Sequence, residues 1–288
     1  MKIHVEAFYD EETYTLTYVV SDQITRDAIV IDPVLDYEPI GSIVKDTSYQ
    51  RVKSYIDQQQ LNLKMVLETH AHADHLSASQ LFKKDYPAVK IAIGRHITAV
   101  QGVFKGIYNL DELFLTDGSQ FDQLIDDDQV FEAGSIEIKA LFTPGHTPAC
   151  LSYLIGNAVF TGDTLFMPDY GTGRCDFPGG DAEQMYHSIQ RLYQLPDDTR
   201  VFTGHDYLPN GRALRYESTI AEQKHHNIQL NIQTNVDEYV KFRGGRDKTL
   251  AAPKLIYQSL LVNIEAGKLP KVQSNGSRYL KIPLNIRC

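Results

Sequence analysis

Three histidines and an aspartate lie within six residues of one another, in the segment His70-Ala71-His72-Ala73-Asp74-His75. This segment directly follows the apolar run Met65-Val66-Leu67, so we expect a loop at the end of a buried strand, which is a rigid base for ligands. Imidazole and carboxylate groups together suit Zn, Fe or Mn better than Cu(I) or Ca. The segment therefore predicts a metal site.

Further candidate ligands follow three other strand-like runs along the chain. After each run a glycine turns the chain, and the next residue is His146, Asp163 or His205. A single histidine of this kind is more often a satisfied polar contact than a ligand. Four such strand ends favour a shared site, because strand ends that meet at one edge of a sheet bring their loops together.

The order HxHxDH, GH, GD and GH resembles that of the metallo-β-lactamase fold. The resemblance covers residues 1–230 approximately, and every ligand position of the pattern is filled, by His70, His72, Asp74, His75, His146, Asp163 and His205. It implies a protein of the α/β (α+β) class, an αββα sandwich with a C-terminal helical extension. The ligand turns would then lie along one edge, where the two sheets meet.

Within this superfamily the chain is most similar to the persulfide dioxygenases, with glyoxalase II as a close relative. The discriminating segment is Gly171-Thr172-Gly173-Arg174-Cys175-Asp176-Phe177, whose Gly-Arg-x-Asp-Phe core is similar to the dioxygenase signature. The sequence His205-Asp206-Tyr207 also resembles the dioxygenase form of the last motif. The resemblance implies that glutathione persulfide, or a similar small thiol persulfide, reacts with O₂ to give sulfite and thiol.

The same ligands can be used in two ways, and the sequence leaves both open. In a dinuclear site, such as one with two Zn, one metal is held by His70, His72 and His146. The second is held by Asp74, His75 and His205, and Asp163 bridges; a bridging water then attacks a thioester carbonyl. In a mononuclear site, two imidazoles and one carboxylate hold Fe(II), and the resemblance assigns these positions to His70, His146 and Asp163. The remaining four residues would orient these ligands and assist proton transfer.

Arg174 is the first candidate for substrate binding, since a guanidinium can hold a carboxylate bidentately. An ion pair between Arg174 and Asp176 that stabilises the loop is an equally good interpretation. Cys175 stands beside this arginine, where positive charge can lower the pKa of a thiol. We nevertheless expect Cys175 to be a small packed side chain rather than a nucleophile.

Tyr207 follows His205 closely enough to point its hydroxyl toward the ligands of the metal, so we assign Asp74 and Tyr207 as catalytic. Tyr207 is also a candidate for substrate binding. Lys224 and Asn227 stand where relatives carry polar groups that contact the substrate. A basic residue of some relatives falls on Gln229 here, so the thiol that carries the persulfide stays undetermined.

The charge, the apolar segments and the cysteines of the chain indicate which partners and which location to expect. The net charge is −9, whereas a nucleic-acid-binding surface normally shows a basic stripe, so we expect no nucleic-acid partner. Residues 1–6 lack the apolar core of a secretory signal, and no apolar run approaches the roughly 20 residues that span a bilayer. Three cysteines, Cys150, Cys175 and Cys288, cannot all pair, which suits a reducing cytoplasm. A homodimer is expected from the resemblance alone.

We predict a catalytic core at residues 1–211 and a helical cap with a C-terminal tail at residues 212–288, packed on the core. Apolar alternation predicts strands at 14–20, 28–33 and 90–94 and a hairpin at 130–142. Apolar residues at helical spacing predict helices at 47–60, 77–85, 181–192 with Asp181 as N-cap, 213–227, 236–242 and 254–266.

Three functions remain in competition. The first is an Fe(II) persulfide dioxygenase, and the second is a metal-dependent thioester hydrolase similar to glyoxalase II. The third is a non-catalytic sensor or binding module that has kept the fold. The complete ligand set argues against the third function, and the segments around Arg174 and Tyr207 favour the first over the second.

Overall fold

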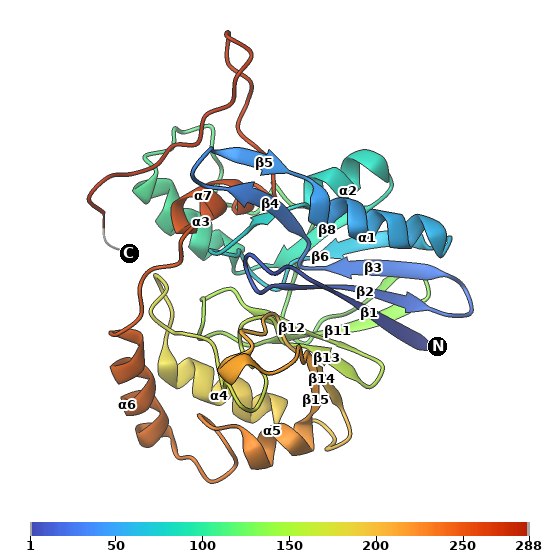
Figure 1. The fold of residues 1–288 in the computed structure, drawn as a ribbon, viewed down its shortest axis with the longest axis vertical. Coiled ribbons are helices and arrows are strands. Elements are labelled where there is room, and N and C mark those ends of the chain that lie inside the picture. Colours follow the sequence, from blue (N-terminus) through green and yellow to red (C-terminus); the bar gives the residue numbers. More distant parts are fainter. Residues whose placement is uncertain (1, 287–288) are drawn as a thin grey trace.

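The computed structural model describes residues 2–286 and contains two six-stranded sheets that pack face to face (Figure 1). The first sheet consists, in spatial order, of β1 (Ile3–Tyr9), β2 (Leu16–Asp22), β3 (Asp27–Ile31), β6 (Asn62–Leu67), β8 (Lys90–Gly94) and β9 (Gln123–Ile125). The second consists of β10 (Val130–Ala133), β11 (Ile136–Phe142), β12 (Leu151–Ile155), β13 (Ala158–Phe160), β14 (Arg200–Phe202) and β15 (Glu217–Thr219). A small sheet joins β5 (Ile43–Lys45), β4 (Val34–Glu38) and β7 (Leu76–Ser77).

The core between the two sheets explains why β2 is buried along its whole length. Leu16, Tyr18 and Val20 of β2 pack in the cluster between the sheets, whereas Val19 packs in the cluster on the outer face of the first sheet. Successive side chains of a strand point to opposite faces, so a strand covered on both faces must be apolar throughout. This burial fixes the sheet that positions the metal-site loops.

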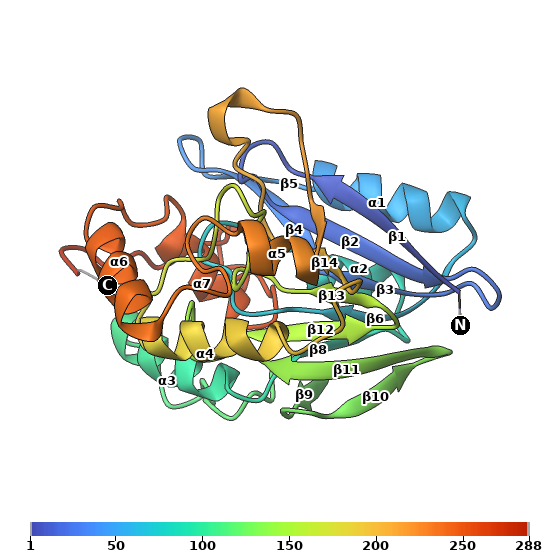
Figure 2. The ribbon, with the colours of Figure 1, turned by 90° about the horizontal axis from the view of Figure 1, so that it is seen from below.

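Helices cover the outer face of each sheet. They are α1 (Thr47–Gln58), α2 (Ser79–Asp85), α3 (Ile97–Ile107), α4 (Ala182–Leu192), α5 (Ile220–His226), α6 (Val236–Asp247) and α7 (Ile256–Asn263), with a 3₁₀ turn at Pro209–Gly211. The first three and α7 pack on the first sheet, and α4, α5 and α6 pack on the second. Seen from below, α4 and α5 lie in front of the second sheet, and α6 lies at the left, beside α4 (Figure 2). The αββα sandwich that we predicted is confirmed.

Most predicted elements are present, with ends that differ by a few residues. The helix expected at 213–227 is wrong in its first half, because residues 217–219 form β15 and α5 begins only at Ile220. Pairing with β14 and an ion pair between Arg200 and Glu217, at 2.6 Å, hold this strand in the sheet. Helix α3 was not predicted, although its buried residues Ile97, Val100, Gln101 and Phe104 have helical spacing.

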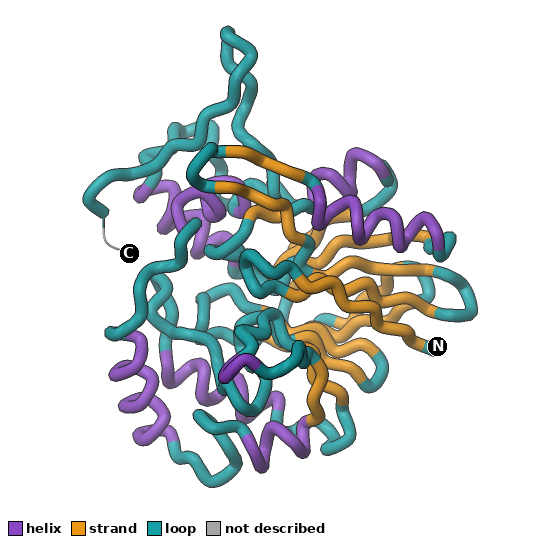
Figure 3. The backbone as a smooth tube through the Cα atoms, in the orientation of Figure 1, coloured by secondary structure: helices purple, strands orange, loops and turns teal. Residues whose placement is uncertain are grey.

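The C-terminal part of the chain contributes to both halves of the molecule. Helix α6 lies against the second sheet, whereas α7 lies with α3 and β4 in the upper half of Figure 1. Figure 3 shows the loop between α6 and α7 as a teal segment that joins the two halves. The second sheet continues past residue 211, because β15 belongs to it. The predicted boundary between the core and the cap, at residue 211, therefore does not fall at the end of this sheet. The division into these two parts stays a prediction.

No helix within residues 2–286 is both long enough and apolar enough to cross a membrane. Cys288, one of the three cysteines that we expected not to form a complete set of disulfides, lies outside the described residues.

The predicted N-cap of α4 gives a direct test of the local sequence reasoning. Asp181 has extended backbone geometry, and its side chain accepts a hydrogen bond from the backbone N–H of Gln184 at 2.7 Å. Asp181→Ala should lower the free energy of unfolding by about 1 kcal/mol, because the helix loses its cap. Urea denaturation measures this loss. The exposed Asp198 supplies the control, and an equal effect of Asp198→Ala would contradict the capping role.

Candidate metal centre

The predicted ligands lie at the edge where the two sheets meet, each shortly after the end of a strand. Strands β6, β11, β13 and β14 end before His70, His146, Asp163 and His205 respectively. Gly162 has a φ of +49°, and a Cβ at this position would collide with the side chain of Thr69. Glycine therefore lets the loop after β13 approach the loop after β6, which brings Asp163 toward His70.

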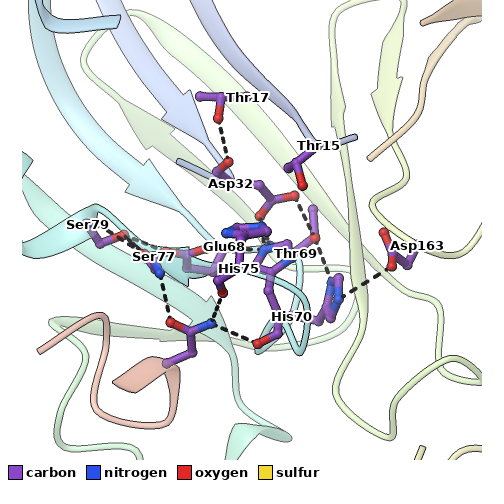
Figure 4. Close-up of polar contacts among 12 residues, drawn as sticks. Thr15, Thr17, Asp32, Glu68, Thr69, His70, His75, Ser77, Ser79 and Asp163 are labelled. Carbon is purple, nitrogen blue, oxygen red and sulfur yellow. Dashed lines mark hydrogen bonds and ion pairs between the residues drawn. The ribbon is translucent and has the colours of Figure 1, made fainter. Parts of the chain in front are cut away.

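A buried relay orients the imidazole of His70 (Figure 4). The Asp32 carboxylate accepts hydrogen bonds from the N–H and the Oγ1–H of Thr69, at 2.7 and 2.8 Å. Thr69 Oγ1 lies 3.0 Å from His70 Nδ1, and because its own proton points to Asp32, it accepts from Nδ1–H. This tautomer leaves the lone pair of His70 Nε2 free. Burial, and then the neighbouring imidazoles, lower the pKa of His70, so it is neutral at pH 7.

The backbone of the Gly-Arg-x-Asp-Phe segment orients His146 in the same manner. His146 Nδ1 donates to the carbonyl oxygen of Arg174 at 2.7 Å, so Nε2 again keeps its lone pair. Sequence reasoning considered only the side chain of Arg174 and missed this role of its backbone. A hydrogen bond from the distal nitrogen of a histidine is the usual way in which proteins orient a metal ligand.

His70, His146 and Asp163 form one cluster, in which the three ligand atoms lie within 4.8 Å of one another. Asp163 Oδ2 is 4.0 Å from His70 Nε2 and 3.6 Å from His146 Nε2. The Nε2 atoms of His70 and His75 are buried and have no hydrogen-bond partner within the described residues. Unpartnered buried nitrogen is unfavourable, and a cation would satisfy it. The donor set therefore fits a divalent metal such as Fe(II) or Zn.

His72 is not part of this cluster but of two neighbouring ones, with Asp74 and His75 and with Asp32 and Glu68. Its Nε2 lies 3.0 Å from Asp32 Oδ1 and 3.4 Å from Glu68 Oε2. Burial opposes a charge on His72, but the two carboxylates raise its pKa above the usual value. With Nε2 held by carboxylates, only Nδ1 of His72 can face a cation.

His205 links the first cluster to Asp74. Its Nε2 lies 3.3 Å from both Asp74 Oδ2 and Asp163 Oδ1. Burial alone would raise the pKa of Asp74, but His205 and His75 lower it to about 2, so this carboxylate is ionised at neutral pH. His205 can therefore link Asp74 to Asp163 and orient the Asp163 carboxylate.

A cavity of about 290 Å³ opens onto Asp74, His146 and Asp163. Tyr207 lines it, with its ring against those of His205 and Tyr170, at centroid distances of 5.3 and 4.7 Å. Burial, and then Asp163 and Asp74, raise the pKa of Tyr207, so its hydroxyl stays protonated and can donate a hydrogen bond into the cavity.

Three arginines line the same cavity, and sequence reasoning found only one of them. Arg174 donates to both carboxylate oxygens of Asp176, at 2.5 and 2.6 Å, so the loop-stabilising ion pair is formed. Arg243 is buried and bound to Asp247 and Gln229, whereas Arg246 is exposed. Arg243 and Arg246 lie beyond residue 242, where the predicted helix ended. Helix α6 instead continues to Asp247.

Two predicted substrate contacts lie outside the cavity. Lys224 forms an ion pair with Asp197 at 2.6 Å on the surface. Asn227 is buried, where it donates to the carbonyl oxygen of Gly171 at 3.1 Å and caps the backbone after α5. Gln229 does line the cavity. The structure thus places Lys224 and Asn227 away from the cavity, and their assignment as substrate contacts stays a prediction.

Cys175 is buried, and burial raises the pKa of its thiol well above the usual value. Its backbone N–H donates to Asp247 at 2.8 Å. A protonated thiol is a poor nucleophile, so the packed interpretation of Cys175 agrees with the structure.

The sequence profile described as "Metallo-beta-lactamase superfamily" matches residues 11–205. The chain belongs to this superfamily. It is 45% identical over 99% of its length to "Glyoxylase B2" of Dictyostelium discoideum, of which it covers 98%. It is also 48% identical over 98% of its length to the "Beta-lactamase hydrolase-like protein" of Xylella fastidiosa. The chain spans only 64% of the length of that relative.

Two further proteins share the name ETHE1. The human "Persulfide dioxygenase ETHE1, mitochondrial" is 28% identical over 92% of this chain and 89% of its own length. The crystal structure of ETHE1 from Myxococcus xanthus superposes with a TM-score of 0.74, at 30% identity, over 92% of this chain and all of that one. These comparisons confirm the fold and the superfamily, and they include relatives with names of two different activities.

Asp163 is the carboxylate that serves either mode of metal binding, so its loss should be decisive. Asp163→Ala leaves two imidazoles without a carboxylate and should abolish metal retention and activity with little change in fold. Metal analysis and circular dichroism measure the two effects. Glu137→Ala, which removes an exposed carboxylate of β11, is the control. Full metal content in the Asp163 variant would show that the centre lies elsewhere.

Proposed function

We propose that the chain is a non-haem Fe(II) persulfide dioxygenase, which converts glutathione persulfide or a similar low-molecular-weight persulfide to thiol and sulfite. One persulfide, one O₂ and one water give one thiol, one sulfite and two protons. The observation that carries the proposal is the cluster of His70, His146 and Asp163. Two histidines and one carboxylate with open positions are the typical ligand set of Fe(II) oxygenases.

The residues of the cluster and around it can hold the metal, orient its ligands and donate a hydrogen bond to the substrate. Fe(II) held by the three ligands would supply the redox chemistry with O₂ and sulfur. Nε2 of His205 lies between Asp74 and the ligand Asp163, at the distances of 3.3 Å given above, and can orient this ligand. The protonated hydroxyl of Tyr207 can donate to a bound anionic persulfide.

Charge at the rim of the cavity suits an anionic substrate. Arg174 and Arg246 line it, and glutathione carries two carboxylates that guanidinium groups can bind. Arg174 uses its Nε and Nη2 for Asp176 and its Nη1 for the carbonyl oxygen of Ala251. Because each Nη carries two protons, Arg174 can bind a substrate carboxylate without releasing Asp176.

The similarity to proteins named ETHE1 supports the same activity, as does the Gly173-Arg174-x-Asp176-Phe177 segment.

The alternative is a glyoxalase II-like thioester hydrolase with two Zn. A specific observation favours it: His72, Asp74 and His75 form a second group of donors beside the first. The more similar Dictyostelium protein is also named a glyoxylase. A non-catalytic module has less support, since all seven ligand positions are filled.

We further propose small-molecule reactants only, a homodimer and a cytoplasmic location. The acidic composition supports small-molecule reactants, and the odd number of cysteines supports a cytoplasmic location. The dimer rests on the resemblance alone.

Anaerobically purified protein should contain about one iron per chain and should consume O₂ only when a persulfide is present. The reason is that one complete triad binds one metal. Elemental analysis and an oxygen electrode measure both quantities, with Asp163→Ala as the control. Two zinc ions per chain, together with rapid thioester hydrolysis and no O₂ uptake, would instead establish the hydrolase.

Arg174→Gln should raise KM by on the order of tenfold with iron content unchanged, because a charge-assisted hydrogen bond contributes roughly 1.5–3 kcal/mol. Steady-state O₂ uptake and iron analysis measure the two effects. The double variant Arg174→Gln/Asp176→Asn is the matched control, since it removes the ion pair without leaving an unpaired carboxylate. Loss of iron or unfolding in both variants would show that Arg174 only holds the loop.

A further inference from the structure

The turn that carries Asp74 and His75 has little regular structure of its own. It connects β6, which ends at Leu67, to the two-residue strand β7 at Leu76–Ser77. The turn is buried on most sides, so its backbone carbonyl and N–H groups need partners from elsewhere in the protein. The element that provides them determines where the side chains of the turn point.

The side chain of Asn263, at the end of α7, provides three of these partners. Its Nδ2 donates to the carbonyl oxygens of His72 and His75, at 2.8 Å each. Its Oδ1 accepts a hydrogen bond from the backbone N–H of Ser77 at 2.8 Å. One amide that is only 4% exposed thus binds both ends of the turn.

Helix α7 is itself held rigidly. Leu260 and Ile264 pack in the cluster with α3, and Val262 packs in the cluster on the outer face of the first sheet. The side chain of Gln80 also donates to the carbonyl oxygen of Ala266, just after the helix, at 3.0 Å. Helix α7 is therefore fixed against the core by packing and by Gln80, in addition to the hydrogen bonds that Asn263 makes to the turn.

The turn is coupled to the metal cluster through one further pair of contacts. Asp74, in the middle of the turn, lies 3.3 Å from His205, which lies 3.3 Å from the second oxygen of Asp163. A displacement of the turn would move Asp74, then His205, and finally the carboxylate that completes the triad.

We propose that Asn263 is a positioning residue for the metal centre. By fixing the backbone at His72, His75 and Ser77, it sets the position of Asp74 and, through His205, the orientation of Asp163. The C-terminal helix is then part of the site rather than an attached cap. This inference rests on the proposed function only in placing a metal at His70, His146 and Asp163, and not on the reaction.

Two variants test this role. Asn263→Asp keeps the shape and the acceptor for Ser77 but faces an oxygen toward two carbonyl oxygens, which repels both. Asn263→Ala removes all three bonds. Ser259→Ala, in the same helix, removes a buried hydroxyl without a hydrogen-bond partner in the described chain. Ile56→Ala, in the core of α1, lowers global stability without touching the turn.

The measurements use Co(II) as the probe in anaerobic protein stripped of metal. We expect both Asn263 variants to bind Co(II) on the order of tenfold more weakly and to show a changed d–d absorption spectrum, because residues that orient ligands affect metal affinity by this amount or more. Ser259→Ala and Ile56→Ala should keep the wild-type affinity and spectrum, although Ile56→Ala lowers Tm. Oxygen uptake, where present, should lose kcat with KM unchanged.

Wild-type Co(II) affinity and spectrum in both Asn263 variants would overturn the inference, whatever reaction the protein catalyses. An equal loss of affinity in Ile56→Ala, or failure of both Asn263 variants to fold at low temperature, would also overturn it in favour of a purely structural role. If the protein hydrolyses thioesters but the variants still weaken Co(II) binding, the proposed reaction is wrong and the role of Asn263 stands.

Discussion

The buried carboxylate of Asp32 holds two metal-site histidines at once. Its oxygens accept from the backbone and side chain of Thr69, which orients His70, and one oxygen lies against His72. Asp32 itself follows β3, the central strand that pairs with β6, and its positive φ of +51° turns the side chain back toward the site. Burial of a carboxylate is costly unless it is hydrogen-bonded, and Thr69 and His72 supply donors to Asp32. The geometry of the first ligand loop depends on these contacts.

The site draws its remaining parts from all along the chain. The second sheet supplies His146, Asp163 and His205, and α6 fixes the loop whose backbone orients His146 through Arg243 and Asp247. Helix α7 binds the turn around Asp74 on the opposite side. The two sheets thus provide the ligands, and the C-terminal helices provide much of what orients them and closes the cavity. This division explains why two of the three arginines of the cavity, Arg243 and Arg246, come from beyond the superfamily match, which ends at residue 205.

The ligands could be predicted because they stand in short, dense motifs at strand ends, where residue type and strand position agree. Asp32 follows the same rule, an acid after an apolar strand, but the proline beside it suggested only the end of the strand. Lys224 was expected near the substrate but lies outside the cavity, since a shift of a few residues along a helix exchanges surface and cavity positions. Asn263 carries no signal in its own neighbourhood, since its partners lie about 190 residues away in the chain. The helix predicted at 236–242 is longer in the structure: Gly244 and Gly245 disfavour a helix, yet α6 continues to Asp247, with Arg243 and Asp247 paired across one turn.

The central claim is that a single iron is held by His70, His146 and Asp163. Anomalous X-ray diffraction from crystals of anaerobically purified protein, recorded at the iron and zinc absorption edges, tests it most directly. The account predicts one iron peak within bonding distance of these three side chains. Two zinc peaks, the second bound by Asp74, His75 and His205, would contradict it.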